Sequence, residues 1–263
     1  MNENNKRIAK NTLVLYMRML AMMILGIFTS RVTINALGVS DYGVNNVVAG
    51  FVSMLGFFNS ILAGGSTRFI TFYLGKGDLG RLREVFSACM TLHVIMALLV
   101  LIGGETIGLW FVNYQLNIDP DRMVAANWVY QFAILSACFS ITQTPYTSEI
   151  IAHEKMSGFA WMVIFDVVVK LLLVALLLYV PSDKLILYSA FMLVVSIIDI
   201  AIARIYCHVK FEECSFKLGY DKPLYKEMAN YTGWNTIGAF AFMSHNQGIN
   251  ILLNLFYGTV VNA

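Results

Sequence analysis

Several ionisable side chains lie inside long apolar stretches of this sequence, among them Arg18, Glu149, Asp166, Lys170 and Asp199. Ionisable residues in membrane helices are costly, and they tend to face a cavity, a partner charge or an ion pathway. Asp166 and Lys170 are four residues apart with the acid first, so on a helix they can pair with each other. They could equally line a polar cavity, where a substrate or a proton would separate them. Arg18 could face the same cavity or extend toward the inner interface.

Uncharged polar residues repeat at helical spacing in the same apolar stretches. Asn11, Thr29 and Thr33 fall on the same side of a helix as Arg18, whereas Arg31 points nearly opposite, toward the outer interface. Further stripes are Ser136, Ser140, Gln143 and Thr147 in one segment, and Asn235, Asn246 and Asn250 in another. Because several helices each present one stripe, the sequence predicts that they share a water-filled interior.

Small residues form one more helical side, made of Ala49, Ser53, Gly56 and Ser60. Small residues allow two membrane helices to approach closely. The sequence therefore predicts close helix packing at this side.

Other patterns have simpler interpretations than the chemistry that they suggest. The stretch GKGDLG (75–80) matches a dinucleotide-binding pattern, but no buried strand precedes it, so we interpret it as a turn between two helices. Cys207, His208 and Cys214 lack a fourth ligand and the spacing of a zinc site, so no metal site is predicted. His93 and His245 could relay protons, although a histidine packed between helices is the simpler interpretation.

The composition indicates which kind of element must position these residues. Of the 263 residues, 58% are hydrophobic and 13% are charged, and the mean hydropathy is +0.68. Soluble domains are less apolar and more charged. The net charge of +2 is too balanced to suggest a nucleic-acid partner. Six segments and most of a seventh are long and apolar enough to cross a bilayer as helices: 11–34, 42–64, 85–112, 123–149, 159–180, 185–206 and 230–256. The predicted fold class is an all-α, polytopic transmembrane helical bundle.

The positive-inside rule gives this bundle an orientation with a cytoplasmic N-terminus. Thirteen Lys and Arg then lie in inside segments, and three (Arg31, Arg122 and Lys184) lie in outside segments. The inside segments 65–84 and 207–229 are longer and basic, and we expect them to be partly helical along the membrane surface.

The chain divides into three predicted parts. Residues 1–206 form a six-helix lobe, 207–229 a cytoplasmic connector, and 230–263 the first helix of a second lobe. This division depends on a faint repeat, because 11–43 resembles 230–258 in its starting Asn, its length and its final Gly turn. The sequence ends inside that second unit, so we expect it to be the N-terminal half of a longer protein.

Four stretches resemble Wzx-type polysaccharide flippases of the MATE-like multidrug/oligosaccharidyl-lipid/polysaccharide superfamily. They are SRVTINALGVSDYG (30–43), GGSTRFITFYLGKGD (64–78), the basic inside loop before the predicted helix at 85–112, and NLFYGTVVNA (254–263). The resemblance implies an exporter of two six-helix lobes that alternates between inward-open and outward-open states. It implies that undecaprenyl-pyrophosphate-linked oligosaccharide is moved across the bacterial inner membrane for surface polysaccharide synthesis, without a cofactor. The polysaccharide-assembly machinery is then an expected partner.

The resemblance also assigns roles to residues of this sequence. The cations implied to hold the pyrophosphate are Arg18, Arg31, Arg68 and Lys170. The carboxylates implied to couple transport to H⁺ or Na⁺ are Asp166, Glu149 and Asp199. The polar lining of the cavity would include Asn11, Ser140, Gln143, Asn246 and Asn250.

Three other functions remain open at this point. MATE-like drug/cation antiporters often have an acid on their first helix, where this sequence has Arg18, which favours an anionic cargo. A membrane polymerase or acyltransferase would need larger outer loops than 38–41, 113–122 and 181–184. An inactive half-transporter is the third alternative.

Overall fold

The computed structural model describes residues 3–54, 56–116, 118–216 and 221–238. Within these ranges every regular element is a helix, and six helical stretches are long and apolar enough to cross a membrane. These stretches are Asn11–Leu37, Val39–Lys76, Leu79–Tyr114, Pro120–Ala152, Met156–Leu176 and Lys184–Lys210. The prediction of an all-helical protein with six such segments before residue 211 is therefore confirmed.

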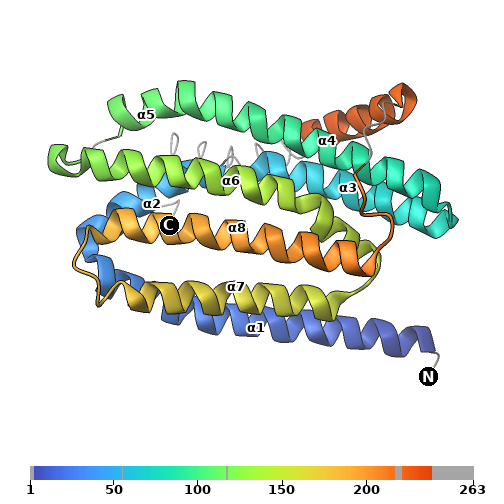
Figure 1. The fold of residues 1–263 in the computed structure, drawn as a ribbon, viewed down its shortest axis with the longest axis horizontal. Coiled ribbons are helices and arrows are strands. Elements are labelled where there is room, and N and C mark those ends of the chain that lie inside the picture. The colour runs from blue at the N-terminus through green and yellow to red at the C-terminus, as the bar shows by residue number, and fades with distance from the viewer. Residues whose placement is uncertain (1–2, 55, 117, 217–220, 239–263) are drawn as a thin grey trace, which may run out of the picture.

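The six stretches contain ten helical elements (Figure 1). The α-helices are α1 (Glu3–Leu37), α2 (Val39–Met54), α3 (Gly56–Lys76), α4 (Leu79–Gly103), α5 (Leu109–Tyr114), α6 (Met123–Ala152), α7 (Met156–Leu176) and α8 (Lys184–Lys210). A π-helical turn, Gly104–Gly108, joins α4 to α5, and a 3-10 turn, Pro120–Arg122, precedes α6. Residues 222–238 form a further helix, which runs through the boundary predicted at 229/230.

Glycine and aspartate residues set the junctions between these helices. Gly38 follows α1 with φ +80°, and Gly77 follows α3 with φ +73°, a left-handed conformation that favours glycine. Asp78 then caps α4, because its carboxylate accepts a hydrogen bond from the Arg81 amide at 3.0 Å. GKGDLG is thus a turn between helices, as predicted. Residues 65–84 are helical except at this turn, because α3 and α4 continue to it, so the expectation that this segment is partly helical is confirmed.

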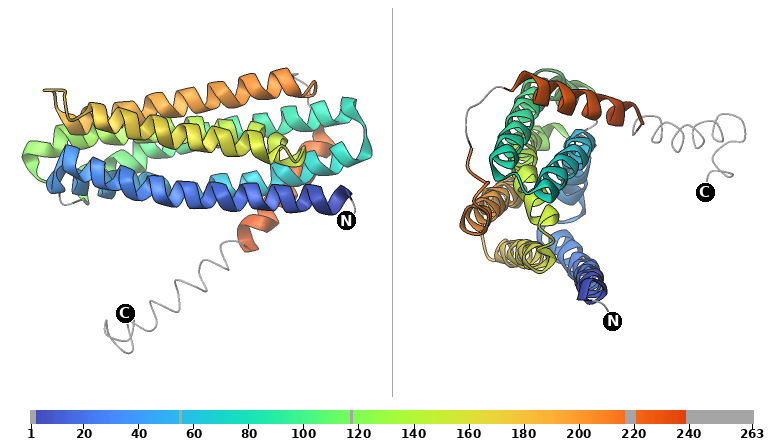
Figure 2. Two further views of the ribbon diagram at one scale, coloured as in Figure 1. Left: turned by 90° about the horizontal axis from the view of Figure 1, so that it is seen from below. Right: turned by 90° about the vertical axis from the view of Figure 1, so that its right-hand side faces the viewer.

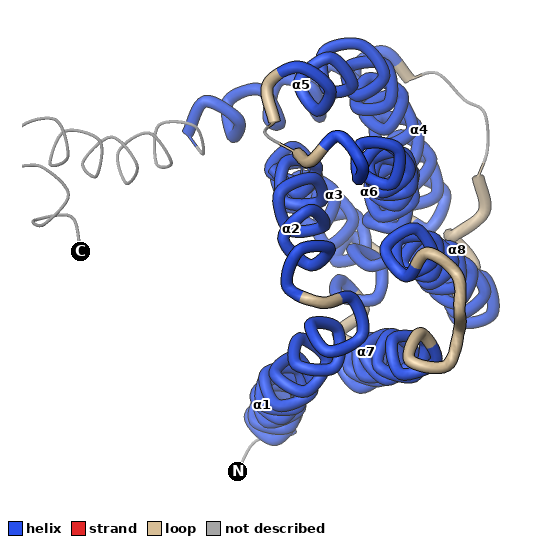
Figure 3. Tube along the Cα trace, turned by 90° about the vertical axis from the view of Figure 1, so that its left-hand side faces the viewer, coloured by secondary structure: helices blue, strands red, loops and turns tan. Residues whose placement is uncertain are grey.

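The helices run side by side along the long axis of the molecule (Figure 1). Figure 3 shows α6 at the centre of the end view, and α6 packs against α2, α3, α4, α7 and α8. Helix α1 packs mainly on α7, at one side of the bundle. We call the end with the α3–α4 and α6–α7 junctions the inner end and the opposite end the outer end, following the predicted orientation.

The core around α6 is close-packed where α4 ends. Tyr130 is fully buried, and its hydroxyl donates a 2.7 Å hydrogen bond to the Gly104 carbonyl oxygen. A Cβ atom at Gly108 would lie 2.1 Å from the Tyr130 hydroxyl, so only glycine fits there. The widened turn and its glycines let the two helices approach.

An arginine joins three elements at the outer end. Arg122 Nε donates to Asp41 Oδ1 of α2 at 2.8 Å, and Arg122 Nη1 donates to Asp183 Oδ2, just before α8, at 2.8 Å. A second bond joins Arg122 Nη2 to Asp41 Oδ2. Asp183 also caps α8 by accepting from the Leu185 and Ile186 amides. The outer ends of α2, α6 and α8 are therefore held together by charge.

At the inner end, the helix over 222–238 lies across α3 and α4 (Figure 2). Leu224 and Met228 are buried against Phe69, Ile70 and Leu82. Arg81 of α4 pairs with Asp221 and with Glu84. Apolar burial and an ion pair thus fix this helix to the bundle.

Candidate functional site

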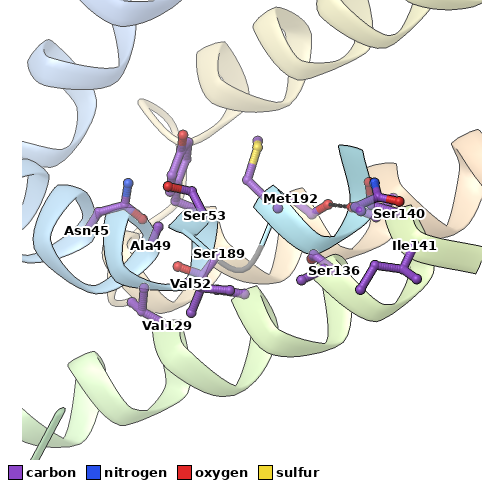
Figure 4. A pocket seen from close by; sticks show the side chains of 16 residues that line it. Asn45, Ala49, Val52, Ser53, Val129, Ser136, Ser140, Ile141, Ser189 and Met192 are labelled. Atoms are coloured by element: carbon purple, nitrogen blue, oxygen red, sulfur yellow. Dashed lines mark hydrogen bonds between the residues drawn. The ribbon is translucent and has the colours of Figure 1, made fainter. Parts of the chain in front are cut away.

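A cavity of about 370 Å³ lies between α2, α3, α6 and α8 (Figure 4). Its polar lining consists of Asn45, Ser53, Asn59, Ser136, Ser140, Tyr188, Ser189 and Ser196. The remaining lining residues are small or apolar, and none of the described lining residues carries a charge. The predicted polar interior is thus present within this bundle, but its described wall is neutral.

The small residues Ala49, Ser53 and Gly56 line this cavity instead of meeting a neighbouring helix. A Cβ atom added at Gly56 would meet nothing within 4 Å. The prediction of close packing on this side is therefore wrong. Small residues permit either outcome, and the position of the neighbouring helix decides between them.

Several hydroxyl groups of the wall donate to the backbone of their own helix. Ser189 Oγ donates to Leu185 O at 3.0 Å, and Ser196 Oγ donates to Met192 O at 3.0 Å. Their oxygen lone pairs remain available as acceptors. Ser136 Oγ is buried without a hydrogen-bond partner in the structure. Such a wall suits a ligand with many hydroxyl groups, which can both donate and accept hydrogen bonds.

Helix α8 leads from the cavity to a charged group nearer the inner end. Ser189, Met192 and Ser196 line the cavity, and Asp199 follows three residues later on the same side of α8. Asp199 lies close enough to Asp166 and Lys170 of α7 for their charges to act on it. Lys170 Nζ lies 2.8 Å from Asp166 Oδ1 and 2.9 Å from Asp166 Oδ2. The pairing of Asp166 with Lys170 is confirmed, and Asp199 joins them.

The cations that the resemblance assigned to one cavity lie at separate places. Arg18 stacks on Phe159 of α7, with its guanidinium carbon 4.7 Å from the ring centroid. Arg68 stacks on Tyr231 at 4.1 Å, and Arg31 is exposed. Lys170 forms an ion pair with Asp166. None of the four is among the described residues that line the neutral cavity.

Of the polar residues predicted to line the cavity, Ser140 does so. Asn11 and Gln143 are half-buried on α1 and α6 and are not among its lining residues. Asn246 and Asn250, together with His245, lie outside the described residues. Residues that sequence reasoning missed include Asn45, Asn59 and Ser189, whose isolated positions on three helices gave no stripe.

Glu149 lies in a second group of ionisable side chains, at the inner end. It is fully buried near the end of α6, next to His153 and Glu213. His153 and Glu213 were not predicted as site residues. The spacing of four residues between Glu149 and His153 was visible in the sequence, whereas the approach of Glu213 depends on the fold.

Cys207 and Cys214 are buried free thiols. The hydrogen bond with Cys207, burial and the neighbouring carboxylates Glu149 and Glu213 raise the pKa of the Cys214 thiol far above its ordinary value. This thiol therefore stays protonated at neutral pH. His93 is fully buried, and its Nδ1 lies 2.8 Å from Cys89 O, which agrees with a packed histidine.

A scan against protein-family models found no match to this chain, and searches of curated proteins and of solved structures found none either.

Proposed function

We propose that this protein is a flippase for a lipid-linked oligosaccharide, with a MATE-like helical lobe in the bacterial inner membrane and a cytoplasmic N-terminus. The observation that carries the proposal is the cavity among apolar helices, whose wall presents hydroxyl and amide side chains. Neutral hydroxyl and amide groups form hydrogen bonds with sugar hydroxyls without the desolvation cost of buried charges. The resemblance of 30–43 and 64–78 to Wzx-type flippases supports the same substrate class.

The apolar helices suit a substrate with a lipid tail. Large apolar side chains are exposed along α1, including Leu13, Met17, Met23 and Ile27. In a bilayer such a surface lies against lipid or another apolar helix. The tail of the substrate can therefore stay in the bilayer while the sugars pass through a polar interior.

The cluster of Asp166, Lys170 and Asp199 is the proposed site of coupling to H⁺ or Na⁺. Asp166 pairs with Lys170, and Asp199 lies near both, so one negative charge lacks an ion-pair partner within the trio. A proton or a sodium ion would supply the missing charge. The pyrophosphate would be held by cations such as Arg18, which lies on the α1–α7 side of the bundle.

The test is complementation of a flippase-null strain with the gene for this protein. Restored surface polysaccharide is the expected result. Ser53→Leu and Ser140→Leu fill the cavity with apolar volume, and they should abolish most of the restored polysaccharide. Ser60→Leu is the matched control, because Ser60 is exposed like Ser53 and Ser140 but is not among the cavity-lining residues. If all three variants restore equal amounts of surface polysaccharide, the cavity is not part of the transport path.

The carboxylates Asp166 and Asp199 favour a second candidate function, that of a MATE-like drug/cation antiporter. Such carboxylates could attract a cationic drug in exchange for a proton. This candidate predicts drug resistance on expression and no polysaccharide phenotype. An inactive half-transporter predicts neither phenotype, and both results would overturn the flippase proposal.

A further inference from the structure

Three potential metal ligands meet at the inner end of the bundle, two of them four residues apart at the end of α6 and the third 60 residues after His153. Glu149 and His153 stand at the end of α6, and Glu213 follows α8. His153 Nε2 lies 2.6 Å from Glu213 Oε1 and 3.3 Å from Glu149 Oε1. One ligand atom from each residue lies within 4.8 Å of the other two. The three side chains thus surround a common point.

Burial makes this group expensive without a cation. Glu149 is 0% exposed and Glu213 is 4% exposed. Neither carboxylate oxygen of Glu149 has a hydrogen-bond partner in the structure. Buried charges are ordinarily paired, hydrogen-bonded or bound to metal. When both carboxylates are ionised, one negative charge stays uncompensated even with a protonated imidazole, and either a proton or a metal ion must supply the missing positive charge.

The surroundings hold the imidazole in place. The His153 ring stacks on Phe211, with centroids 4.1 Å apart and planes 14° apart. Glu154, the next residue, has φ +55°, a left-handed conformation that non-glycine residues seldom adopt. This left-handed residue ends α6 directly after His153. Stacking and the helix end therefore fix the ring with Nε2 toward the carboxylates.

We propose that Glu149, His153 and Glu213 bind a divalent transition-metal ion of the Zn²⁺ class. Imidazole nitrogen together with carboxylate oxygen suits Zn²⁺ and its neighbours, whereas Mg²⁺ and Ca²⁺ prefer oxygen ligands alone. Zn²⁺ holds ligands at about 2.0–2.2 Å, which sets two tetrahedral ligand atoms roughly 3.4 Å apart. The distances from His153 Nε2, 2.6 Å and 3.3 Å, lie within 1 Å of that separation. Small side-chain movements would complete three ligands, and water would complete the fourth.

The ligands join two parts of the chain. Two come from α6, the central helix, and the third comes from the segment between α8 and the helix over 222–238. A bound ion would tie that segment to the bundle. The proposed metal site is separate from the neutral cavity. Evidence for or against metal binding therefore does not depend on whether the protein is a flippase.

The experiment uses the purified whole protein in detergent, without an affinity tag and after chelator treatment. Titration with Co²⁺ is followed by its visible d–d absorption, and Zn²⁺ is then added as a competitor. We expect one Co²⁺ per chain, displacement by Zn²⁺, and a rise of several degrees in Tm with Zn²⁺ that a chelator reverses. Glu149→Gln, His153→Gln and Glu213→Gln should each weaken Co²⁺ binding by at least about tenfold.

Glu212→Gln and His208→Ala are the matched controls. Both residues are exposed and adjacent to the cluster, and neither belongs to it. Equal Co²⁺ binding by the cluster variants and the controls would overturn the proposal. If a cluster variant fails to fold, measurements on the unaltered protein still test whether the site binds metal. The absence of both Co²⁺ absorption and a Zn²⁺-dependent rise in Tm would also overturn it.

Discussion

The two ends of the bundle each bring two carboxylates to one basic side chain, but with different bases and different burial. At the outer end, Arg122 binds Asp41 and Asp183, and all three side chains are between 19% and 34% exposed. At the inner end, His153 lies between Glu149 and Glu213, which are almost fully buried. Arginine stays protonated, whereas histidine can lose its proton and ligate a metal. The outer group therefore acts as a permanent clamp, whereas the inner group is where the proposed metal ion would bind.

Arg122→Ala should have the largest effect on stability. It would leave Asp41 and Asp183 facing each other without a cation and would separate the outer ends of α2, α6 and α8. Removal of one partner costs about 3–5 kcal/mol in a buried ion pair and an exposed pair contributes about 0–1 kcal/mol, so these half-buried side chains place the cost at about 2–3 kcal/mol. Thermal unfolding of the variant and of the unaltered protein in detergent measures this loss of stability.

Arg122→Lys provides the control for this comparison. Lysine keeps the charge but loses the planar fork that binds two carboxylates at once. Its loss of stability should be smaller than that of Arg122→Ala. If both variants unfold with unchanged Tm, the outer group is not a clamp.

Gly108→Ala should have the next largest effect, because Gly108 lies against a fully buried tyrosine side chain. The new Cβ atom would lie 2.1 Å from the hydroxyl of Tyr130, which is fully buried and bonded to Gly104 O. At the inner half, a Cβ atom at Gly158 would lie 2.6 Å from the hydroxyl of Tyr206, which is half-buried and can shift. We expect losses of about 2 kcal/mol for Gly108→Ala and about 1 kcal/mol for Gly158→Ala.

Gly103→Ala is the matched control for both glycines. A Cβ atom at Gly103 meets nothing within 4 Å, so alanine should be neutral or slightly stabilising in this helix. The second substitution Tyr206→Phe removes the nearest clashing atom, the hydroxyl oxygen, and should restore part of the stability of Gly158→Ala. A Gly158→Ala variant that is less stable than Gly108→Ala would contradict the predicted order of these two stability losses.

The smallest expected effect concerns acid sensitivity at the outer clamp. Burial raises the pKa of Asp183, but hydrogen bonds from Arg122 and from the Ile186 and Leu185 amides outweigh burial and hold the pKa below its ordinary value. Stability from a carboxyl with a lowered pKa is present above the ordinary pKa and is lost as pH falls through the folded pKa. Asp183→Asn should therefore lower Tm at pH 7, and its difference from the unaltered protein should shrink below about pH 4. A difference that is constant from pH 7 to pH 3 would contradict this prediction.

Structural features that depend only on residues close together in the sequence could be predicted from the sequence. The apolar segments, the turn at Gly77 and Asp78, and the pair of Asp166 and Lys170 all follow from spacing along one helix or one junction. The cavity wall could be predicted only in part. Ser140 was identified from a stripe, whereas the side of Ser53 and Gly56 was interpreted as a packing surface.

Contacts between segments that are far apart in the sequence could not be predicted from residue spacing. Glu213 reaches His153 only because α8 packs against α6 and the chain turns after Lys210. Arg18 lies against Phe159 because α1 packs on α7. A polar stripe shows that a helix side has a polar neighbour, but it does not identify which helix supplies that neighbour.

The π-helical turn at Gly104–Gly108 has a consequence for how this chain tolerates insertions. One residue added to an α-helix rotates every later side chain by about 100° around the helix axis. A single wide turn absorbs the extra residue, and the buried positions Gly104, Gly108 and Val112 keep facing α6 at intervals of four. A homologue that is one residue shorter between 104 and 108 should therefore have an ordinary α-helical turn here and keep the same contacts beyond it.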